Sequence, residues 1–122
     1  MNVVLVEDDI GMRMALARVL QIAGHKVEAF ASAEDCVVST AAPRADCLVL
    51  DIRLPGESGF DLHKRLARSG SKAPVIFITA HDSAAARGKA MQSGAAAFLT
   101  KPFEGRALLG AVGEAIRSQA GG

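Results

Sequence analysis

The acidic residues Glu7, Asp8 and Asp9 follow directly after an apolar run at residues 3–6. Three neighbouring carboxylates repel one another, so a bound cation would offset their repulsion. Magnesium prefers carboxylate oxygens together with water and phosphate oxygens. These residues therefore indicate a divalent-cation site at the end of a buried strand.

Three further polar side chains come at the ends of other apolar runs: Asp51 after residues 47–50, Thr79 after residues 75–78, and Lys101 shortly after residues 97–99. An aspartate beside a bound cation can act as a nucleophile toward phosphorus and form an aspartyl-phosphate. The cation would neutralise charge on the transferred group, while a lysine and a threonine hydroxyl would hold its remaining oxygens. Phosphoryl transfer is therefore the chemistry that these residue types favour.

The composition is that of an ordinary globular domain. The 122 residues suit one domain with a real core, because half of them are apolar and 22% are charged. The net charge of +1 predicts neither a nucleic-acid nor a membrane surface. Because the chain has five Phe and no Trp or Tyr, we expect no stacking surface for single-stranded nucleic acid.

Neither a targeting segment nor a membrane segment is visible. The longest apolar runs fall far short of a membrane span, and the N-terminus lacks the basic lead and long apolar stretch of a signal peptide. Cys36 and Cys47 form no CxxC pair and no metal spacing with histidine. We therefore expect two reduced thiols and a cytoplasmic protein.

Short apolar runs alternate with helical patterns along the whole chain. Strands are predicted at residues 3–6, 26–30, 47–50, 75–78 and 97–99. Helices are predicted at residues 10–23, 32–41, 58–68, 83–93 and 105–117. The strand at 26–30 alternates apolar and polar residues, which is typical of an edge strand.

Strict alternation of strand and helix predicts an α/β fold, with a parallel sheet covered by helices on both faces. Right-handed crossovers place the carboxyl ends of all strands along one edge. Four acids, a hydroxyl and a lysine therefore converge on that edge. Ligands of such sheets bind there, near the point where the strand order reverses.

Four motifs follow one another at set spacings: the acidic pair Glu7-Asp8 after the first strand, LDIRLPGESG around Asp51, ITA at residues 78–80, and TKPF at residues 100–103. With them the chain resembles, over essentially its whole length, the receiver domain of two-component response regulators. LDIRLPGESG, VIFITAHD and KPFE look most like the FixJ-like subgroup. The resemblance implies one CheY-like, flavodoxin-like (βα)5 domain over residues 1–122, with strand order 2-1-3-4-5 and the start of a flexible tail or linker at 118–122.

The resemblance also implies roles for individual residues around a magnesium ion. Asp51 would accept the phosphoryl group and would also be a metal ligand. Asp8 would bind Mg²⁺ directly, and Glu7 would bind it directly or through water. The backbone carbonyl of Arg53 would be a further ligand. The peptide bond before Pro102 would be cis.

A second group of residues would hold the phosphate and respond to it. Thr79 and Lys101 would act in catalysis with the acceptor aspartate. The phosphate oxygens would lie against Arg53, Thr79, Ala80 and Lys101. Thr79 and Phe98 would reposition when the domain switches.

As a receiver, the chain would be a signalling switch rather than an enzyme, although it would assist its own phosphorylation and dephosphorylation. A sensor histidine kinase would donate the phosphoryl group, and the face made by the fourth helix, fifth strand and fifth helix would change shape. The chain would be either a stand-alone receiver or a receiver taken from a longer protein. In the second case the output would be transcriptional, through a C-terminal DNA-binding domain that is not present in this chain. The fourth helix offers few large apolar residues, so a phosphorylation-dependent homodimer would be weak. No direct binding to nucleic acid or membrane is expected.

Several residues also have simpler interpretations. Asp9 could cap the first helix, and Phe98 could be a core residue that does not switch. His25, His63 and His81 share no metal spacing and are expected at the surface. His81 should lie near the site, where it and Arg53 would influence how fast the phosphoryl group is lost.

Other functions compete with this interpretation. A haloacid-dehalogenase-type phosphatase also uses a nucleophilic aspartate and magnesium, but it requires a second acid where Arg53 stands, and a cap domain. A nucleotide-binding flavodoxin relative would need backbone amides and glycines where VEDDIGM stands. The main alternative is a protein-interaction module that works without phosphate. The intact set of acids, threonine and lysine argues against it.

Overall fold

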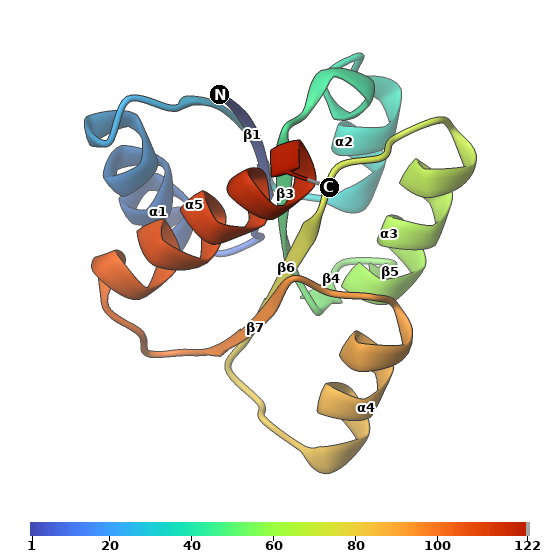
Figure 1. The fold of residues 1–122 in the computed structure, drawn as a ribbon. Helices are drawn as coiled ribbons and strands as arrows, with labels where there is room; N and C mark the ends of the chain where they lie inside the picture. Colours follow the sequence, from blue (N-terminus) through green and yellow to red (C-terminus); the bar gives the residue numbers. More distant parts are fainter. Residues whose placement is uncertain (122) are drawn as a thin grey trace.

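Five parallel strands form the central sheet, in the order β2-β1-β3-β6-β7 (Figure 1). The computed structural model describes residues 1–121, and the side chains of residues 1–119. The strands are β1 (Asn2–Val6), β2 (Lys26–Phe30), β3 (Cys47–Asp51), β6 (Val75–Thr79) and β7 (Ala97–Thr100). Counted along the chain, this is the predicted order 2-1-3-4-5, so the α/β flavodoxin-like fold is confirmed.

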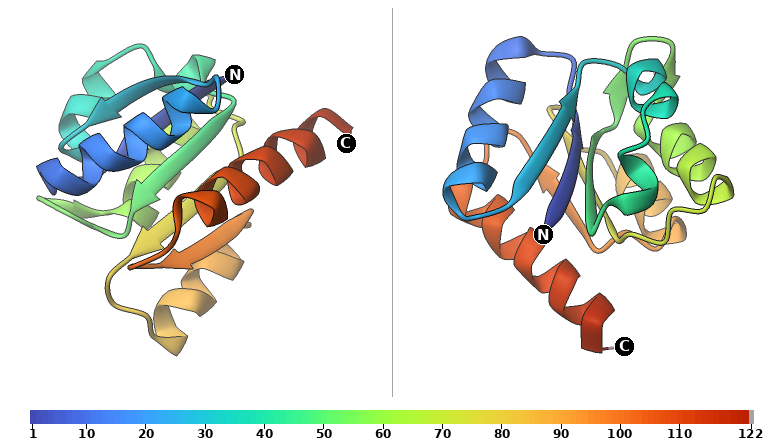
Figure 2. Two further views of the ribbon diagram at one scale, coloured as in Figure 1. Left: turned by 90° about the vertical axis from the view of Figure 1, so that its left-hand side faces the viewer. Right: turned by 90° about the horizontal axis from the view of Figure 1, so that it is seen from above.

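Five helices cover the two faces of the sheet: α1 (Ile10–Ile22), α2 (Ala33–Val38), α3 (Gly59–Arg68), α4 (Ala84–Gln92) and α5 (Gly105–Gly121). Figure 2 shows α1 and α5 on one side and α2, α3 and α4 on the other. Each side encloses its own apolar cluster, one around Leu20 and Leu108 and the other around Phe77 and Leu62. Helices on both faces leave the strand ends as the open part of the sheet.

The first four helices begin at side-chain caps, each accepting the backbone N–H three residues on: Asp9 from Met12, Ser32 from Asp35, Ser58 from Asp61, and Ser83 from Ala86. These bonds satisfy amides that have no partner within the helix. Asp9 is therefore a helix cap, as its simpler interpretation predicted. Gly94 follows α4 with φ of +72°, a left-handed conformation that favours glycine and ends the helix there.

The helix predicted over 32–41 is shorter than expected. α2 ends at Val38, and a separate 3₁₀ turn, η1, covers Ala42–Arg44. Ser39 is extended, with ψ of 167°, and its hydroxyl donates to the carbonyl of Cys36 at 2.7 Å. This local bond competes with helix continuation.

Two further differences lie in the loops and at the last helix. An antiparallel hairpin of β4 (Arg53–Leu54) and β5 (Glu57–Ser58) follows β3, and no strand was predicted there. Its turn contains Pro55 and Gly56, which explains why the sequence suggested only a loop. α5 extends to Gly121 and so overlaps the tail predicted over 118–122; residue 122 lies outside the described residues.

The centre of the sheet is the buried core of the domain. All residues of β3 and β6 are buried, whereas β2 is half exposed, as predicted for an edge strand. Along the chain through residue 121, no helix is both long enough and apolar enough to cross a membrane.

Candidate functional site

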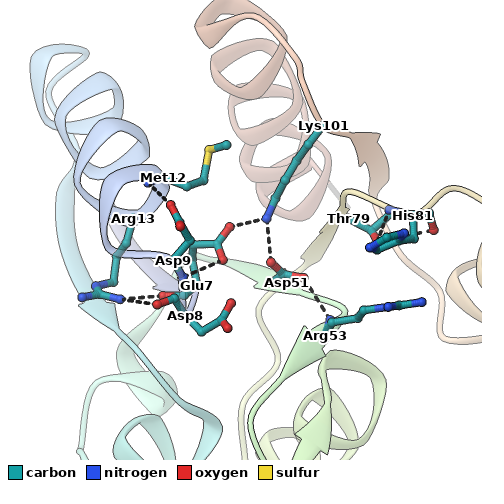
Figure 3. A network of polar contacts seen from close by, with 10 residues as sticks. All are labelled: Glu7, Asp8, Asp9, Met12, Arg13, Asp51, Arg53, Thr79, His81 and Lys101. Atoms are coloured by element: carbon teal, nitrogen blue, oxygen red, sulfur yellow. Dashed lines mark hydrogen bonds and ion pairs between the residues drawn. The ribbon is translucent and has the colours of Figure 1, made fainter.

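The carboxyl ends of four strands bring the predicted site residues together (Figure 3). Glu7 follows β1, Asp51 ends β3, Thr79 ends β6, and Lys101 follows β7. The parallel register aligns these ends, because Asp51 is paired with Ile78 and Thr79 is paired with Thr100. Residues far apart in the sequence therefore share one edge of the sheet.

Lys101 bridges two buried carboxylates. Its Nζ donates to Asp51 Oδ2 at 2.7 Å and also to Glu7 Oε1. The exposed fractions of the side chains are 13% for Lys101, 0% for Glu7 and 6% for Asp51. One ammonium thus faces two carboxylates, which leaves an excess of negative charge when both are ionised.

The site changes how its members ionise. Burial raises the pKa of Glu7 to about 7, a shift that the hydrogen bond from Lys101 opposes and the neighbouring Asp51 increases. Burial lowers the pKa of Lys101, but its bonds to Asp51 and Glu7 outweigh that effect and raise it overall. Lys101 is therefore held in its charged form.

Glu7, Asp8 and Asp51 form a cluster that fits a divalent cation. Each offers a carboxylate oxygen, and these oxygens lie within 4.8 Å of one another. Glu7 and Asp51 are buried while Asp8 is exposed, so the cluster opens to solvent on one side. An all-oxygen donor set suits Mg²⁺ better than a soft metal.

Arg13 supports this cluster from α1. Its Nη1 donates to the backbone carbonyls of Glu7 at 2.8 Å and of Asp8 at 3.3 Å. The β1–α1 turn is also held by the backbone N–H of Asp9, which donates to Glu7 Oε2 at 3.2 Å. Both acidic side chains are thus presented by an ordered turn.

The second oxygen of Asp51 is held by the β4–β5 hairpin. The backbone N–H of Arg53 donates to Asp51 Oδ1 at 2.9 Å. The chain returns close to Asp51 at Gly59, where a Cβ atom would lie 2.3 Å from the Asp51 carbonyl oxygen. Only glycine fits this approach, so the hairpin can close over the strand end.

Thr79 lies on the same edge but engages its own loop. Its side chain is buried, and its Oγ1 accepts the backbone N–H of His81 at 3.0 Å. The Thr79 carbonyl accepts the N–H of Lys101 at 2.7 Å, which ties β6 to the end of β7. The peptide bond between Lys101 and Pro102 is cis, as predicted. Ala80, next in the chain, is exposed.

Phe98 lies on β7 away from this cluster and is half-buried. The guanidinium carbon of Arg87 lies 4.8 Å from its ring centroid, and Arg87 is in turn bound to Asp82 by two 2.7 Å hydrogen bonds. The sequence interpretation missed both Arg87 and Asp82. Only their spacing of five residues across the start of α4 could have suggested the pair.

The histidines differ from one another in exposure. His81 is exposed, as predicted, but His25 and His63 are half-buried. The ring of His63 stands edge-on to Phe77 with centroids 5.9 Å apart. Burial lowers the pKa of His63. His25 and His63 are therefore less exposed than predicted, and for His63 the cause is its packing from α3 against Phe77 of the sheet.

Comparison with known proteins agrees with this geometry. The profile of the response regulator receiver domain matches residues 3–113. The chain is 46% identical over 110 residues to nodulation protein W of Bradyrhizobium diazoefficiens, covering 90% of this chain and 48% of that protein. It is 35% identical over 113 residues to the response regulator protein TodT of Pseudomonas putida, covering 93% and 50%.

Solved structures give the same result. The response regulator StyR superposes with a TM-score of 0.86 at 39% identity, over 98% of this chain and 60% of that chain. The BeF₃-activated DrrB receiver domain superposes with a TM-score of 0.86 at 27% identity, over 95% and 97%. The chain spans about half the length of the curated relatives named above. Fold, site and sequence together place it in one family of signalling switches: the chain belongs to the response regulator receiver domain family of two-component systems.

Proposed function

We propose that Asp51 is the phosphoacceptor of this switch and receives its phosphoryl group from a sensor histidine kinase. The observation that carries the proposal is the position of the Asp51 carboxylate. Arg53 N–H holds one of its oxygens and Lys101 holds the other, and the carboxylate lies beside two further acids. A carboxylate held in this way is oriented before the donor arrives.

Mg²⁺ is the cofactor that this donor set favours. Glu7, Asp8 and Asp51 would hold it with carboxylate oxygens, and the backbone carbonyl of Arg53 would complete the protein ligands. When bound, the ion supplies charge neutralisation for the transferred phosphoryl group. It would also relieve the excess negative charge around Glu7 and Asp51, which Lys101 alone does not balance.

The transfer itself is a nucleophilic displacement. An oxygen of Asp51 attacks phosphorus while the bond to the donor nitrogen breaks, and that bond's electron pair leaves with the nitrogen. Lys101 is close enough to pair with a phosphoryl oxygen, since it already contacts Asp51. Arg53, Thr79 and Ala80 would hold the remaining oxygens through backbone N–H groups and the threonine hydroxyl.

Phosphorylation would then change the loop after β6. The Thr79 hydroxyl, which accepts the His81 N–H, would leave that bond and donate a hydrogen bond to a phosphoryl oxygen. Movement of this loop would reach Phe98 through α4, and the α4–β7–α5 face would change shape. The added charge acts by shifting an equilibrium between two forms of the domain.

The output would be transcriptional. One relative, 34% identical over 102 residues, is the C4-dicarboxylate transport transcriptional regulatory protein DctD of Rhizobium meliloti. A DNA-binding domain outside this chain and a cytoplasmic location fit that role. Met91 is the one large apolar side chain that α4 exposes. A homodimer through this face would therefore be weak and phosphorylation-dependent.

The test is phosphorylation by phosphoramidate, read by intact mass. Wild type should gain one phosphoryl group with Mg²⁺ and none with a chelator, and Asp51→Asn should gain none. Asp61→Asn is the matched control, because Asp61 is an exposed aspartate on α3, and it should behave as wild type. No mass shift in wild type under any condition would favour a phosphate-independent interaction module instead.

A further inference from the structure

We infer that Arg65 on α3 is a positioning residue that, through its ion pair with Glu57, holds the β4–β5 hairpin in place against Asp51. It would thereby set the affinity for the metal ion and the rate of phosphorylation. The inference rests on the proposed function, since it concerns the same carboxylate and the same cation. It assigns a role to Glu57 and Arg65, neither of which is predicted to bind the metal ion or the phosphoryl group.

The hairpin is too small to be stable by itself. It consists of two residue pairs, Arg53 with Ser58 and Leu54 with Glu57. Even longer isolated two-stranded hairpins are only marginally stable in water. Its position must therefore come from contacts with neighbouring elements, and Figure 1 shows it between the end of β3 and the start of α3.

The hairpin is directly bonded to the acceptor carboxylate. Its first residue, Arg53, donates its N–H to Asp51 Oδ1 at 2.9 Å (Figure 3). Its base, beside the Arg53–Ser58 pair, is closed by the N–H of Gly59, which donates to the Ile52 carbonyl at 2.8 Å. A shift of the hairpin would therefore move the Arg53 N–H that binds Asp51 and also the Arg53 carbonyl, which is the proposed metal ligand.

Arg65 ties the hairpin to a rigid helix. Its Nη1 is paired with Glu57 Oε1, and Glu57 lies directly opposite Leu54 in the hairpin. The Glu57 side chain is only 19% exposed, and its Oε2 is buried without a hydrogen-bond partner among the described residues. Its charge therefore depends on Arg65 for compensation. Arg65 also lies 3.8 Å from Glu34, but that carboxylate is largely exposed and contributes little.

Two substitutions separate positioning from simple electrostatics. Arg65→Gln and Glu57→Gln both break the ion pair, but they change the charge near the site in opposite directions. If charge alone matters, Arg65→Gln should strengthen Mg²⁺ binding and Glu57→Gln should weaken it. If Arg65 positions the hairpin, both should weaken it.

We expect about tenfold weaker Mg²⁺ binding in both variants, the size typical of residues that orient metal ligands. Binding is measured by magnesium titration of the Arg53 amide resonance, and independently from the magnesium dependence of the phosphorylation rate. Arg65→Lys, which keeps the charge, should recover most of the affinity. Glu34→Gln is the control and should bind Mg²⁺ as wild type does.

The double variant Glu57→Gln, Arg65→Gln guards against a folding defect, because it leaves no unpaired buried charge. It should resemble either single variant rather than their sum. Unchanged affinity in the folded variants, or opposite shifts in the two single variants, would overturn the inference. Wild-type protein that binds Mg²⁺ but is never phosphorylated would contradict the proposed function, while a loss of affinity in both variants would still support the positioning role.

Discussion

Two ion-paired clusters on this domain have similar geometry and opposite surroundings. Lys101 lies 2.7 Å from Asp51 at the carboxyl edge of the sheet, and Arg87 lies 2.7 Å from Asp82 at the start of α4. The first cluster is buried, whereas the Arg87 and Asp82 side chains are 54% and 37% exposed. Breaking a buried pair leaves an uncompensated charge, but an exposed pair is worth little. Distance alone therefore does not tell which pair matters.

The carboxyl edge of the sheet and α4 also differ in how closely their backbones are packed. At the carboxyl edge, Gly59 is packed so closely that a Cβ would meet the Asp51 carbonyl. On α4, a Cβ at Gly88 would meet nothing within 4 Å, and Ala90 is the helix's one buried residue. The edge is closely packed, whereas α4 buries little of its surface. Under the proposed function, that contrast would let the α4 face change shape while the site stays in place.

The largest expected effect comes from Lys101→Ala. Glu7 and Asp51 would lose their shared cation, so the free energy of unfolding should fall by about 3 kcal/mol above neutral pH without Mg²⁺. Added Mg²⁺ should restore part of this loss, because it replaces the missing positive charge. Urea unfolding with a chelator or with Mg²⁺ measures both effects. A wild-type unfolding curve for Lys101→Ala would show that the buried cluster is no stronger than the exposed one.

The pH dependence of stability should reflect Glu7. Its pKa is about 7 in the folded protein and 4.5 as the ordinary value, so the folded state keeps a proton that the unfolded state releases. The stabilising contribution is complete below pH 4.5 and is lost as pH rises through about 7, on the order of 3 kcal/mol in all. Glu7→Gln should remove this slope in metal-free urea unfolding. A slope that persists in Glu7→Gln would assign it to another group.

Two glycine substitutions should have opposite signs. Gly59→Ala forces a Cβ against the Asp51 backbone and should lower the free energy of unfolding by about 2 kcal/mol. Gly88→Ala should raise it by about 0.5–1 kcal/mol, because alanine favours a helix interior and finds open space there. Thermal or urea unfolding of the two variants side by side tests this contrast. If both substitutions changed the free energy of unfolding by the same amount and in the same direction, the edge would be no more tightly packed than α4.

The smallest effect is expected from Asp82→Asn. It breaks the exposed pair with Arg87, so the urea midpoint should not change within error. The contact of Arg87 with Phe98 should loosen, which NMR shifts of the Phe98 ring would report. A clear loss of stability would contradict the distinction drawn between the two clusters.

Local patterns in the sequence were sufficient to predict a parallel α/β sheet and the residues that share its carboxyl edge, whereas the strand order came from the resemblance to the receiver family. Alternating apolar runs and helical segments indicated the parallel sheet, and parallel strands must end on one edge. Glu7, Asp51, Thr79 and Lys101 were therefore predicted to meet there, and they do. Such inferences succeed because strand direction and side-chain position follow from chain topology rather than from details of packing.

Only the tertiary structure decided the contacts within that edge. Lys101 joins Glu7 and Asp51 across 94 and 50 residues of sequence, so no local pattern reveals which carboxylates it binds. The raised pKa of Glu7 likewise depends on its burial, which many distant side chains create together. The hairpin held by Glu57 and Arg65 was also invisible in the sequence. Burial and side-chain rotamers come from packing between elements, and packing exists only once the chain has folded.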